Sequence, residues 1–447
     1  MHSYNEYGSI ASSINLAEGH VHLESGSSVS NVIVKELSYG DTTVTPTSES
    51  HKVTIEKDVT ITNIYSTVSG VTPSVEGEGK DPKVVLNNIP NYNYTAILNG
   101  WATTSDLGDM PLDMRGKRGE KNTVTLLKDQ SIYVGSADGK YIFRDGYDVT
   151  IDLNGFTLNV PGSIRIGADD YTNNYRVTGI GNVTIKNGTI KCSGSAANVA
   201  LLQVNANSTL TLENVTIETT GSGVFSNQKA SSVTIKNTVI KTGGFGIATN
   251  AGEGASEDVT ISVESTKIES ESTGICLNVS GMLNVKDSYI MGEEQGVMVR
   301  AGNAVISDSE IHAKYFNEVG DKTNYSNTKR SAEAWGNGNA VMCGAVVVGD
   351  YCSGSYPTAA NCTLNNVTIT AEDGWNRGVI VLSSDSDAAT FFSYDDKCTV
   401  NGKKIDGHSS SLTSNKTNEL YVHDAEIEGV AKGSISVNGS VVRQSAN

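Results

Sequence analysis

Helix-forming sequence and long apolar runs are what this chain lacks most clearly. No stretch of 18 apolar residues is present, so we expect no transmembrane helix. Among 447 residues, proline (7) and aromatic residues (6%) are scarce, whereas glycine (46) is abundant. Together with frequent Thr, Ser, Asn and Val, this composition predicts many short β-strands joined by tight turns.

Positive charge is also in short supply. The chain has 33 Lys and Arg against 50 Asp and Glu, a formal net charge of −17. A field of this sign repels polyanions such as nucleic acids and uronate-rich polysaccharides, so we expect no nucleic-acid partner. An acidic surface is compatible with Ca²⁺, but no spacing of acidic residues matches a metal site, and no cofactor is predicted.

The six cysteines are too sparse for a disulfide scaffold and include no Cys-x-x-Cys pair. Cys276 and Cys362 fall within predicted strands, where we expect them to act as small buried hydrophobic residues. Cys343 and Cys352 are nine residues apart on either side of a predicted turn. A disulfide between these two remains an alternative.

The first residues, Met1-His2-Ser3-Tyr4-Asn5, have neither a basic segment nor an apolar core, so the sequence shows no signal peptide. The protein is then either cytoplasmic or secreted, and the composition favours an extracellular or bacterial cell-surface protein. In that case, a cleaved signal peptide would precede the sequence.

A repeated pattern, apolar-x-apolar-x-[Asn/Asp/Ser]-x-x-Ile, runs through much of the chain. It recurs eight times and ends at Ile190, Ile217, Ile240, Ile268, Ile290, Ile311, Ile369 and Ile427. The spacings are 27, 23, 28, 22, 21, 58 and 58 residues. Repeats of this length predict a solenoid.

Each repeat predicts a strand, a sharp bend and a second strand. Alternation with a period of two buries one face of a strand. Asn and Asp tolerate the left-handed conformation that a bend requires. The predicted bends are Asn187, Asn214, Asn237, Asp287, Asp308, Asn366 and Asp424. Stacked bends would form a ladder of side chains inside the solenoid.

Glycine follows several of the closing isoleucines at an interval of six residues and begins another apolar stretch. These positions are Gly223, Gly246, Gly274, Gly296 and Gly433. One coil is therefore predicted to contain three strands, with a polar bend after the first, a glycine turn after the second and a variable loop after the third.

This coil resembles the pectin-lyase-like superfamily of right-handed parallel β-helices. The resemblance covers about residues 140–440, and strand signals at 124–129 and 149–158 resemble the opening coils of bacterial surface β-helix proteins. It implies an all-β, three-sheet solenoid over 121–447. Residues 1–120 are predicted to be an irregular β region or earlier coils, with a short capping helix over 9–16.

The resemblance implies architecture more strongly than activity, because the fold hosts lyases, glycosidases, phage tailspikes and non-enzymatic surface proteins. Lyases of this kind use Arg or Lys with Ca²⁺-binding carboxylates on the outward face of the third strands. The predicted outward residues are Phe225, Ala248, Cys276, Met298 and Ile380, none of which is charged.

Hydrolases of this fold use three Asp with Gly-His-Gly and Arg-x-Lys motifs. The pair Asp169-Asp170 and the segment Gly407-His408-Ser409 do not match that pattern. The missing motifs therefore favour a protein without catalytic activity, and an enzyme stays open as an alternative.

A long insertion at about 314–337 interrupts the coils where a third strand is due, and such departures frequently carry function. Aromatic rings beside Asn, Asp and Arg suit a glycan, although the rings could instead pack as the loop's own small core. The candidate ligand-binding residues are Arg300, Tyr315, Phe316, Trp335, Asp350, Tyr351, Trp375 and Arg377.

The sequence therefore predicts a non-catalytic extracellular or cell-surface protein that binds glycan or acts as an adhesin. Two alternatives stay open. One is a polysaccharide lyase or glycoside hydrolase with an atypical site, and the other is a structural protein similar to a phage tailspike.

Overall fold

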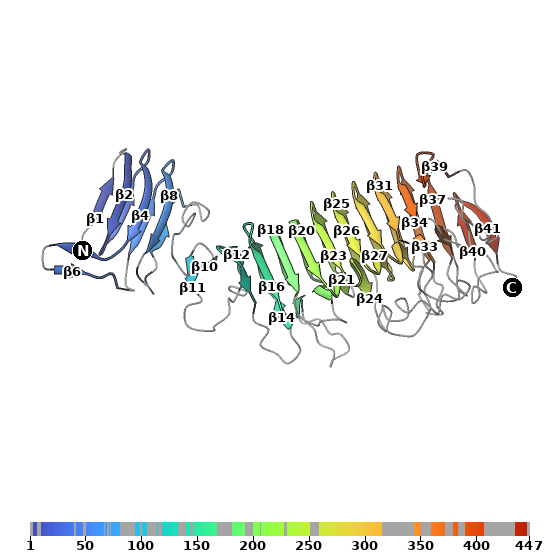
Figure 1. Cartoon of the computed structure of the whole chain (residues 1–447), viewed down its shortest axis with the longest axis horizontal. Helices are drawn as coiled ribbons and strands as arrows, with labels where there is room; N and C mark the ends of the chain where they lie inside the picture. The colour runs from blue at the N-terminus through green and yellow to red at the C-terminus, as the bar shows by residue number, and fades with distance from the viewer. Residues whose placement is uncertain are drawn as a thin grey trace. The chain divides into compact units, whose positions relative to one another are not determined.

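The structure is a computed structural model. It describes residues 3–6, 10–39, 42–47, 51–66, 68, 71, 73–80, 94–98, 101–104, 114, 119–132, 140–143, 146–167, 181–192, 200–205, 207–227, 230–250, 259–314, 344–349, 359–371, 379–382, 389–405 and 434–444. Within these ranges every regular element is a β-strand, and most strands stack in parallel (Figure 1). The chain is therefore all-β with large parallel sheets, an arrangement compatible with a β-helix.

Two compact units divide the chain. The N-terminal unit comprises residues 1–117, 121–131 and 149–156, and the C-terminal unit comprises 118–120, 132–148 and 157–447. In the described part of either unit, no helix is long and apolar enough to cross a membrane.

The N-terminal unit begins with two short parallel sheets around one apolar core that includes Val21, Leu23, Ile55 and Ile64. One sheet contains β1 (Ser3–Glu6), β3 (His20–Leu23), β7 (Lys52–Ile55) and β9 (Ser74–Glu76), and the other contains β2 (Ile10–Leu16), β4 (Ser28–Val34) and β8 (Thr60–Ser66). The remaining strands of the unit are the hairpin β5 (Leu37–Tyr39) and β6 (Thr42–Val44), then β10 (Tyr94–Leu98), β11 (Trp101–Thr104), β12 (Lys121–Leu126), β13 (Gln130–Ser131) and β15 (Asp148–Asp152).

The helix predicted over residues 9–16 is wrong, because Ile10–Leu16 forms strand β2. Ile14 and Leu16 alternate with polar residues and lie in register with Val32 and Val34 of β4. All four side chains belong to the apolar core, so burial against a neighbouring strand decides the conformation.

His51 gives the N-terminal unit a pH-sensitive point. Its side chain is only 4% exposed, and Nε2 lies 3.1 Å from the carbonyl oxygen of Thr47. A carbonyl only accepts hydrogen bonds, so Nε2 carries the ring hydrogen and Nδ1 is the nitrogen with the free lone pair. Nδ1 is buried and has no hydrogen-bond partner. Burial lowers the pKa of His51 below its usual 6.5, nearby His20 lowers it further, and Thr47 and Glu18 act in the opposite direction.

We expect acid to destabilise the N-terminal unit through His51. As the pH falls, His51 of the unfolded chain binds a proton near its usual pKa of 6.5, whereas His51 of the folded chain binds one only at a lower pH. The free energy of unfolding therefore decreases as the pH falls from about 6.5 towards the folded-state pKa. Hydrogen exchange of β3 and β7 at pH 8 and pH 5 measures this loss. In His51→Gln the pH dependence should shrink, and an unchanged dependence would contradict the assignment.

Between residues 232 and 382, each coil of the C-terminal unit contributes three strands, as the repeat predicts. In one coil, β22 (Ser232–Lys236) leads through Asn237 into β23 (Val239–Thr242), and β24 (Ile247–Asn250) follows. Equivalent strands of successive coils pair in parallel; Ile235, for example, pairs with Leu212 on one side and with Val263 on the other.

The first and second strands of the coils belong to one sheet, and the third strands form a separate nine-stranded sheet (Figure 1). First strands are β25 (Val259–Glu264), β28 (Gly281–Lys286), β31 (Gly302–Ser307), β34 (Ala360–Asn365), β37 (Thr390–Tyr394) and β40 (Ser434–Val437), beside β22. Second strands are β16 (Thr157–Val160), β26 (Lys267–Ser270), β29 (Tyr289–Gly292), β32 (Glu310–Ala313), β35 (Thr368–Ala371) and β38 (Thr399–Val400), beside β23. The long strands β18 (Asn182–Cys192) and β20 (Thr209–Thr219) run through both positions.

The third strands are β14 (Lys140–Phe143), β17 (Ser163–Ile166), β19 (Ala200–Val204), β21 (Ser222–Asn227), β24, β27 (Thr273–Leu277), β30 (Gln295–Val299), β33 (Gly344–Val348) and β36 (Ile380–Leu382). Strand β33 occupies the third-strand position after β32, since Gln295 pairs with Gly344. The interruption that the sequence places at about 314–337 therefore separates β32 from β33.

The polar bends adopt the left-handed conformation that the sequence predicts. The bend residues Asn187, Asn214, Asn237, Ser265, Asp287, Asp308 and Asn366 all have φ between +47° and +58°. Asp424 lies outside the described residues. The prediction of a ladder inside the solenoid is wrong, because Asn214 Nδ2 donates to Asn187 Oδ1 (3.3 Å) and Asn366 Nδ2 to Asp308 Oδ1 (2.8 Å) at exposed positions.

At every bend except Asn187, which a glycine follows, the residue after the bend is buried, whereas the bend residue itself is not. Four of these residues are buried hydroxyl residues, namely Thr238, Thr266, Ser288 and Ser309. Ser288 Oγ accepts a hydrogen bond from the Thr266 backbone N–H (3.1 Å) and donates to the Lys286 carbonyl (2.7 Å). The hydroxyl groups of Thr238, Ser288 and Ser309 each bond the backbone of two coils, so the internal ladder consists of hydroxyl groups.

Ser288→Ala is expected to lower the free energy of unfolding by about 1–3 kcal/mol, because it leaves a buried backbone N–H without an acceptor. Ser262→Ala, on the outward face of a neighbouring coil, is the matched control and should change stability by less than about 0.5 kcal/mol. Urea unfolding of both variants makes the comparison. Equal effects would contradict the ladder.

One coil lacks the sequence pattern. Cys362 of β34 pairs with Phe392 of β37, and Ile369 of β35 pairs with Val400 of β38. Strands β37 and β38 therefore belong to the next coil of the stack, which the sequence pattern does not show. Its bend is a longer turn in which Asp395 Oδ1 accepts a hydrogen bond from the Lys397 backbone N–H (3.1 Å), not a single left-handed residue. The last predicted repeat, ending at Ile427, lies outside the described residues.

The stack ends in an antiparallel hairpin. Strand β41 (Ser440–Gln444) pairs antiparallel with β40, which itself pairs in parallel with β37. Reversal of the chain direction at this point interrupts the parallel series at the edge of the sheet.

Candidate binding face

Rows of equivalent side chains cover the outward face of the first strands, with one residue from each coil. Alternation within a strand points every second residue outward, and in-register pairing aligns the coils about 4.8 Å apart. The three rows are Asn182, Thr209, Ser232, Thr260, Met282, Asn303, Asn361 and Phe391; then Thr184, Thr211, Thr234, Ser262, Asn284, Val305, Thr363 and Ser393; then Lys186, Glu213, Lys236, Glu264, Lys286, Ser307 and Asn365.

The charged row alternates in sign from coil to coil, from Lys186 to Lys286. Lys236 Nζ lies 3.1 Å from Glu264 Oε2 across two neighbouring strands. A second alternating row, Lys191, Glu218, Lys241 and Glu269, runs along the second strands. Each coil carries the same sign in both rows, so neighbouring coils attract each other and one-coil slips are disfavoured.

Lys191 and Glu218 show the effect of this pairing on a side chain. Lys191 Nζ lies 2.8 Å from Glu218 Oε2, and this hydrogen bond lowers the pKa of the Glu218 carboxyl below its usual range. The lysines and glutamates of the two rows balance each other's charge locally, although the chain as a whole is acidic.

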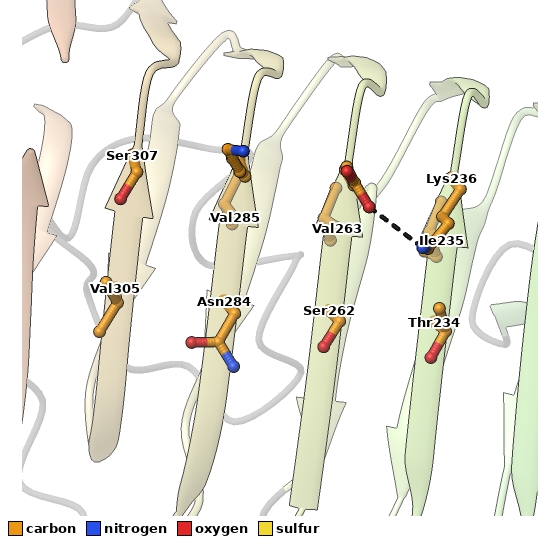
Figure 2. Close-up of a pocket in the computed structure, with 11 residues that line it drawn as sticks. Thr234, Ile235, Lys236, Ser262, Val263, Asn284, Val285, Val305 and Ser307 are labelled. Carbon is orange, nitrogen blue, oxygen red and sulfur yellow. Dashed lines mark ion pairs between the residues drawn. The ribbon is translucent and has the colours of Figure 1, made fainter. Parts of the chain in front are cut away.

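A shallow groove of about 310 Å³ lies on this face. Figure 2 shows Thr234, Ser262, Asn284 and Val305 side by side on four neighbouring strands, with Lys236 and Ser307 further along two of them. The groove is lined by Thr234, Ile235, Lys236, Ser262, Val263, Glu264, Asn284, Val285, Lys286, Val305 and Ser307. Hydroxyl, amide and charged groups therefore line one open surface at regular intervals.

Glycosidic-bond hydrolysis normally needs two carboxyl groups facing each other across the bond. Glu264 is the one carboxylate among the residues lining the groove, and its Oε2 already bonds Lys236 (Figure 2). The groove can therefore donate and accept hydrogen bonds, but its lining does not supply the pair of carboxylates.

The third strands present a different outward face. In register, it carries Arg165, Gln203, Phe225, Ala248, Cys276, Met298, Val347 and Val381. Arg165 and Gln203 are polar residues that the sequence pattern missed, and both are buried. The predicted outward position of Ile380 is wrong, because Ile380 pairs with Val346 and Val381 takes the outward position.

Arg300 is the one predicted ligand-binding residue in the described part of the chain. It follows β30, its side chain is only 4% exposed, and its backbone N–H bonds the Leu277 carbonyl at 2.7 Å. Burial raises the pKa of the neighbouring Cys276 thiol to about 12, and the charge of Arg300 acts in the opposite direction. The other seven predicted residues, Tyr315, Phe316, Trp335, Asp350, Tyr351, Trp375 and Arg377, lie outside the described residues.

The structure describes four cysteines, Cys192, Cys276, Cys362 and Cys398, and all four are buried free thiols. Cys276 in β27 and Cys362 in β34 are the two that the sequence places in strands. Cys343 and Cys352 lie outside the described residues. Among the described His, Cys, Asp and Glu, no group of three could hold a metal ion.

Comparisons of the chain with protein-family models, with curated proteins and with solved structures find no match. The residues and their geometry therefore carry the functional argument.

Sequence reasoning missed two residues of the outward face. Met282 (37% exposed) and Phe391 (41% exposed) are the large hydrophobic side chains that stand out as exposed in the described parts of the chain. Both belong to the same row. Phe391 was visible in the sequence as part of an aromatic run, but only pairing of Phe392 with Cys362 establishes that Phe391 points outward.

Proposed function

We propose that this chain is a right-handed parallel β-helix of the pectin-lyase-like kind that binds a glycan without cleaving it. We also propose an extracellular or bacterial cell-surface location, which the composition supports. The observation that carries the proposal is the open groove on the outward face of the first strands, where Thr234, Ser262 and Asn284 lie beside apolar side chains such as Val305.

Sugar hydroxyls both donate and accept hydrogen bonds, and the groove offers both kinds of partner. Thr234 and Ser262 supply hydroxyls, and Asn284 supplies an amide. Because these groups repeat with the coils, one row can contact several units of a polymer. A repeating ligand therefore suits this face better than a compact small molecule, which needs a deeper pocket.

The ion-paired glutamate supports binding over catalysis. A lyase would need a free Arg or Lys near a metal, and a hydrolase would need a second carboxylate. In the groove, Lys236 and Glu264 bond each other instead.

Incubation of the full chain with a panel of insoluble polysaccharides tests the proposal. We expect retention on at least one polymer, without release of reducing or unsaturated ends. The double variant Thr234→Ala/Asn284→Ala should weaken retention, and Thr184→Ala, in the same row but outside the groove, serves as its control. Release of sugar ends would replace binding by catalysis, and retention on no polymer would refute the proposal.

The predicted aromatic residues of the insertion and of its neighbouring coils can be examined in the same assay. If Trp335→Ala and Trp375→Ala reduce retention while the groove double variant does not, the glycan site lies with the aromatic residues and not in the groove.

A further inference from the structure

A short strip beside the groove combines apolar and amide side chains in one row. In register, it consists of Met282, Asn303, Asn361 and Phe391, from four successive coils. Three intervals of about 4.8 Å give it a length of about 14 Å, that of a short oligosaccharide. Its two ends are the exposed large hydrophobic residues Met282 and Phe391.

The middle of the strip is prepared for hydrogen bonding. Asn361 Nδ2 donates to Asn303 Oδ1 at 2.9 Å, an exposed contact that fixes the orientation of both amides. A primary amide has two donor hydrogens and an acceptor oxygen, so after this contact Asn303 keeps its donors and Asn361 keeps its acceptor. Two oriented amides between two apolar side chains match a sugar chain, whose hydroxyls lie at the ring edges and whose C–H groups form the ring faces.

We infer that a single, uncharged, linear polysaccharide lies along this strip, parallel to the stacking direction of the coils, with the Phe391 ring against one pyranose face. This inference rests on the proposed function and adds the class of glycan, its direction and its contact residues. The strip has no charged side chain. On three of its four coils the charged row, which lies beyond the row of Asn284, is represented by Lys286, Ser307 and Asn365, and Lys286 Nζ lies 3.6 Å from Asp287 Oδ2. An acidic polymer would meet the net charge of −17 without a compensating basic patch on the strip.

A peptide fits this face less well. Extended peptides bind sheets by adding a strand to an open edge, where backbone N–H and C=O groups are free. Under the strip, β31 pairs with β28 and β34, and β34 pairs with β31 and β37, so the backbone of both strands is hydrogen-bonded on both sides. Only side chains are available, which favours a ligand recognised through ring faces and hydroxyls.

Retention on neutral and acidic polysaccharides, measured by affinity electrophoresis of the full chain, tests the inference. We expect retention on a neutral polymer, weakened roughly tenfold by Phe391→Ala, by Asn361→Ala to a lesser degree, and not by Phe391→Tyr, which keeps the ring. Thr209→Ala, in the same row but outside the strip, is the matched control. Circular dichroism should show an unchanged fold for the exposed variants.

The outcomes separate the strip from the proposed function. Wild-type retention that Phe391→Ala leaves intact refutes the strip and spares the glycan-binding proposal. Retention only on acidic polymers also refutes the strip, whereas no retention on any polymer refutes both. A dimer in light scattering that Phe391→Ala dissociates, with glycan retention unchanged, would assign the strip to a second copy of the chain and overturn the inference.

Discussion

Gly274→Ala is expected to lower the free energy of unfolding of the C-terminal unit by about 3 kcal/mol, the upper part of the range for overpacking a core. A Cβ atom at this position would lie 2.5 Å from the Gly296 carbonyl oxygen and 2.6 Å from Ile290 Cγ2. The first of these is a backbone atom of the next coil, which cannot move without disturbing its strand. The glycine is therefore required by lack of space and not by an unusual φ.

Urea unfolding followed by far-ultraviolet circular dichroism measures the effect. Gly402→Asn is the control, because Gly402 has a φ of +79°, a Cβ atom there would meet no other atom within 4 Å, and Asn tolerates left-handed geometry. It should remain within about 0.5 kcal/mol of the wild type. A Gly274→Ala protein as stable as this control would show that the coils can separate to admit a methyl group.

Phe392→Ala is expected to cost about 3–5 kcal/mol, whereas Phe391→Ala should cost less than about 0.5 kcal/mol. The two residues are adjacent in β37 but lie on opposite faces, with Phe392 fully buried and Phe391 exposed. The pair thus separates the contribution of packing from that of residue type.

Strand β37 pairs with β34 on one side and with β40 on the other, so the loss in Phe392→Ala should appear first in β34, β37 and β40. Hydrogen exchange should accelerate in those strands while β22 and β25 stay protected. Uniform acceleration throughout the C-terminal unit would indicate that it unfolds as one cooperative block.

Much of the coil was predictable because its rules are local. Alternation identified the buried residues, and the left-handed preference of Asn identified bends such as Asn237. Whether the ladder of side chains at the bends lies inside or outside the coils was not predictable from these local rules. It depends on which residue of the bend turns inward, and in the structure that is Thr238.

Errors arose where the local rule changed. The coil through Phe392 and Val400 was missed because a longer turn at Asp395 replaces the single bend residue. The register of β36 was misplaced by one residue, since Ala345 and Val379 occupy the position that glycine holds in earlier coils. Pairing between coils, which the sequence does not display, decides both cases.

The candidate binding face was present in the sequence but could not be assembled from it. Thr234, Ser262 and Asn284 are separated by more than twenty residues each and become neighbours only through register. The aromatic insertion attracted attention because it departs from the repeat. The groove lies instead in the most regular part of the chain.

The alternating charges also constrain how such a protein can lengthen or shorten in evolution. Loss of the one coil that carries Lys236 would bring Glu213 beside Glu264, and duplication of it would place two lysines together. Loss of that coil with the next would bring Glu213 beside Lys286 and preserve attraction. In this region, changes of two coils at a time keep the pattern, so viable length variants should differ by even numbers of coils.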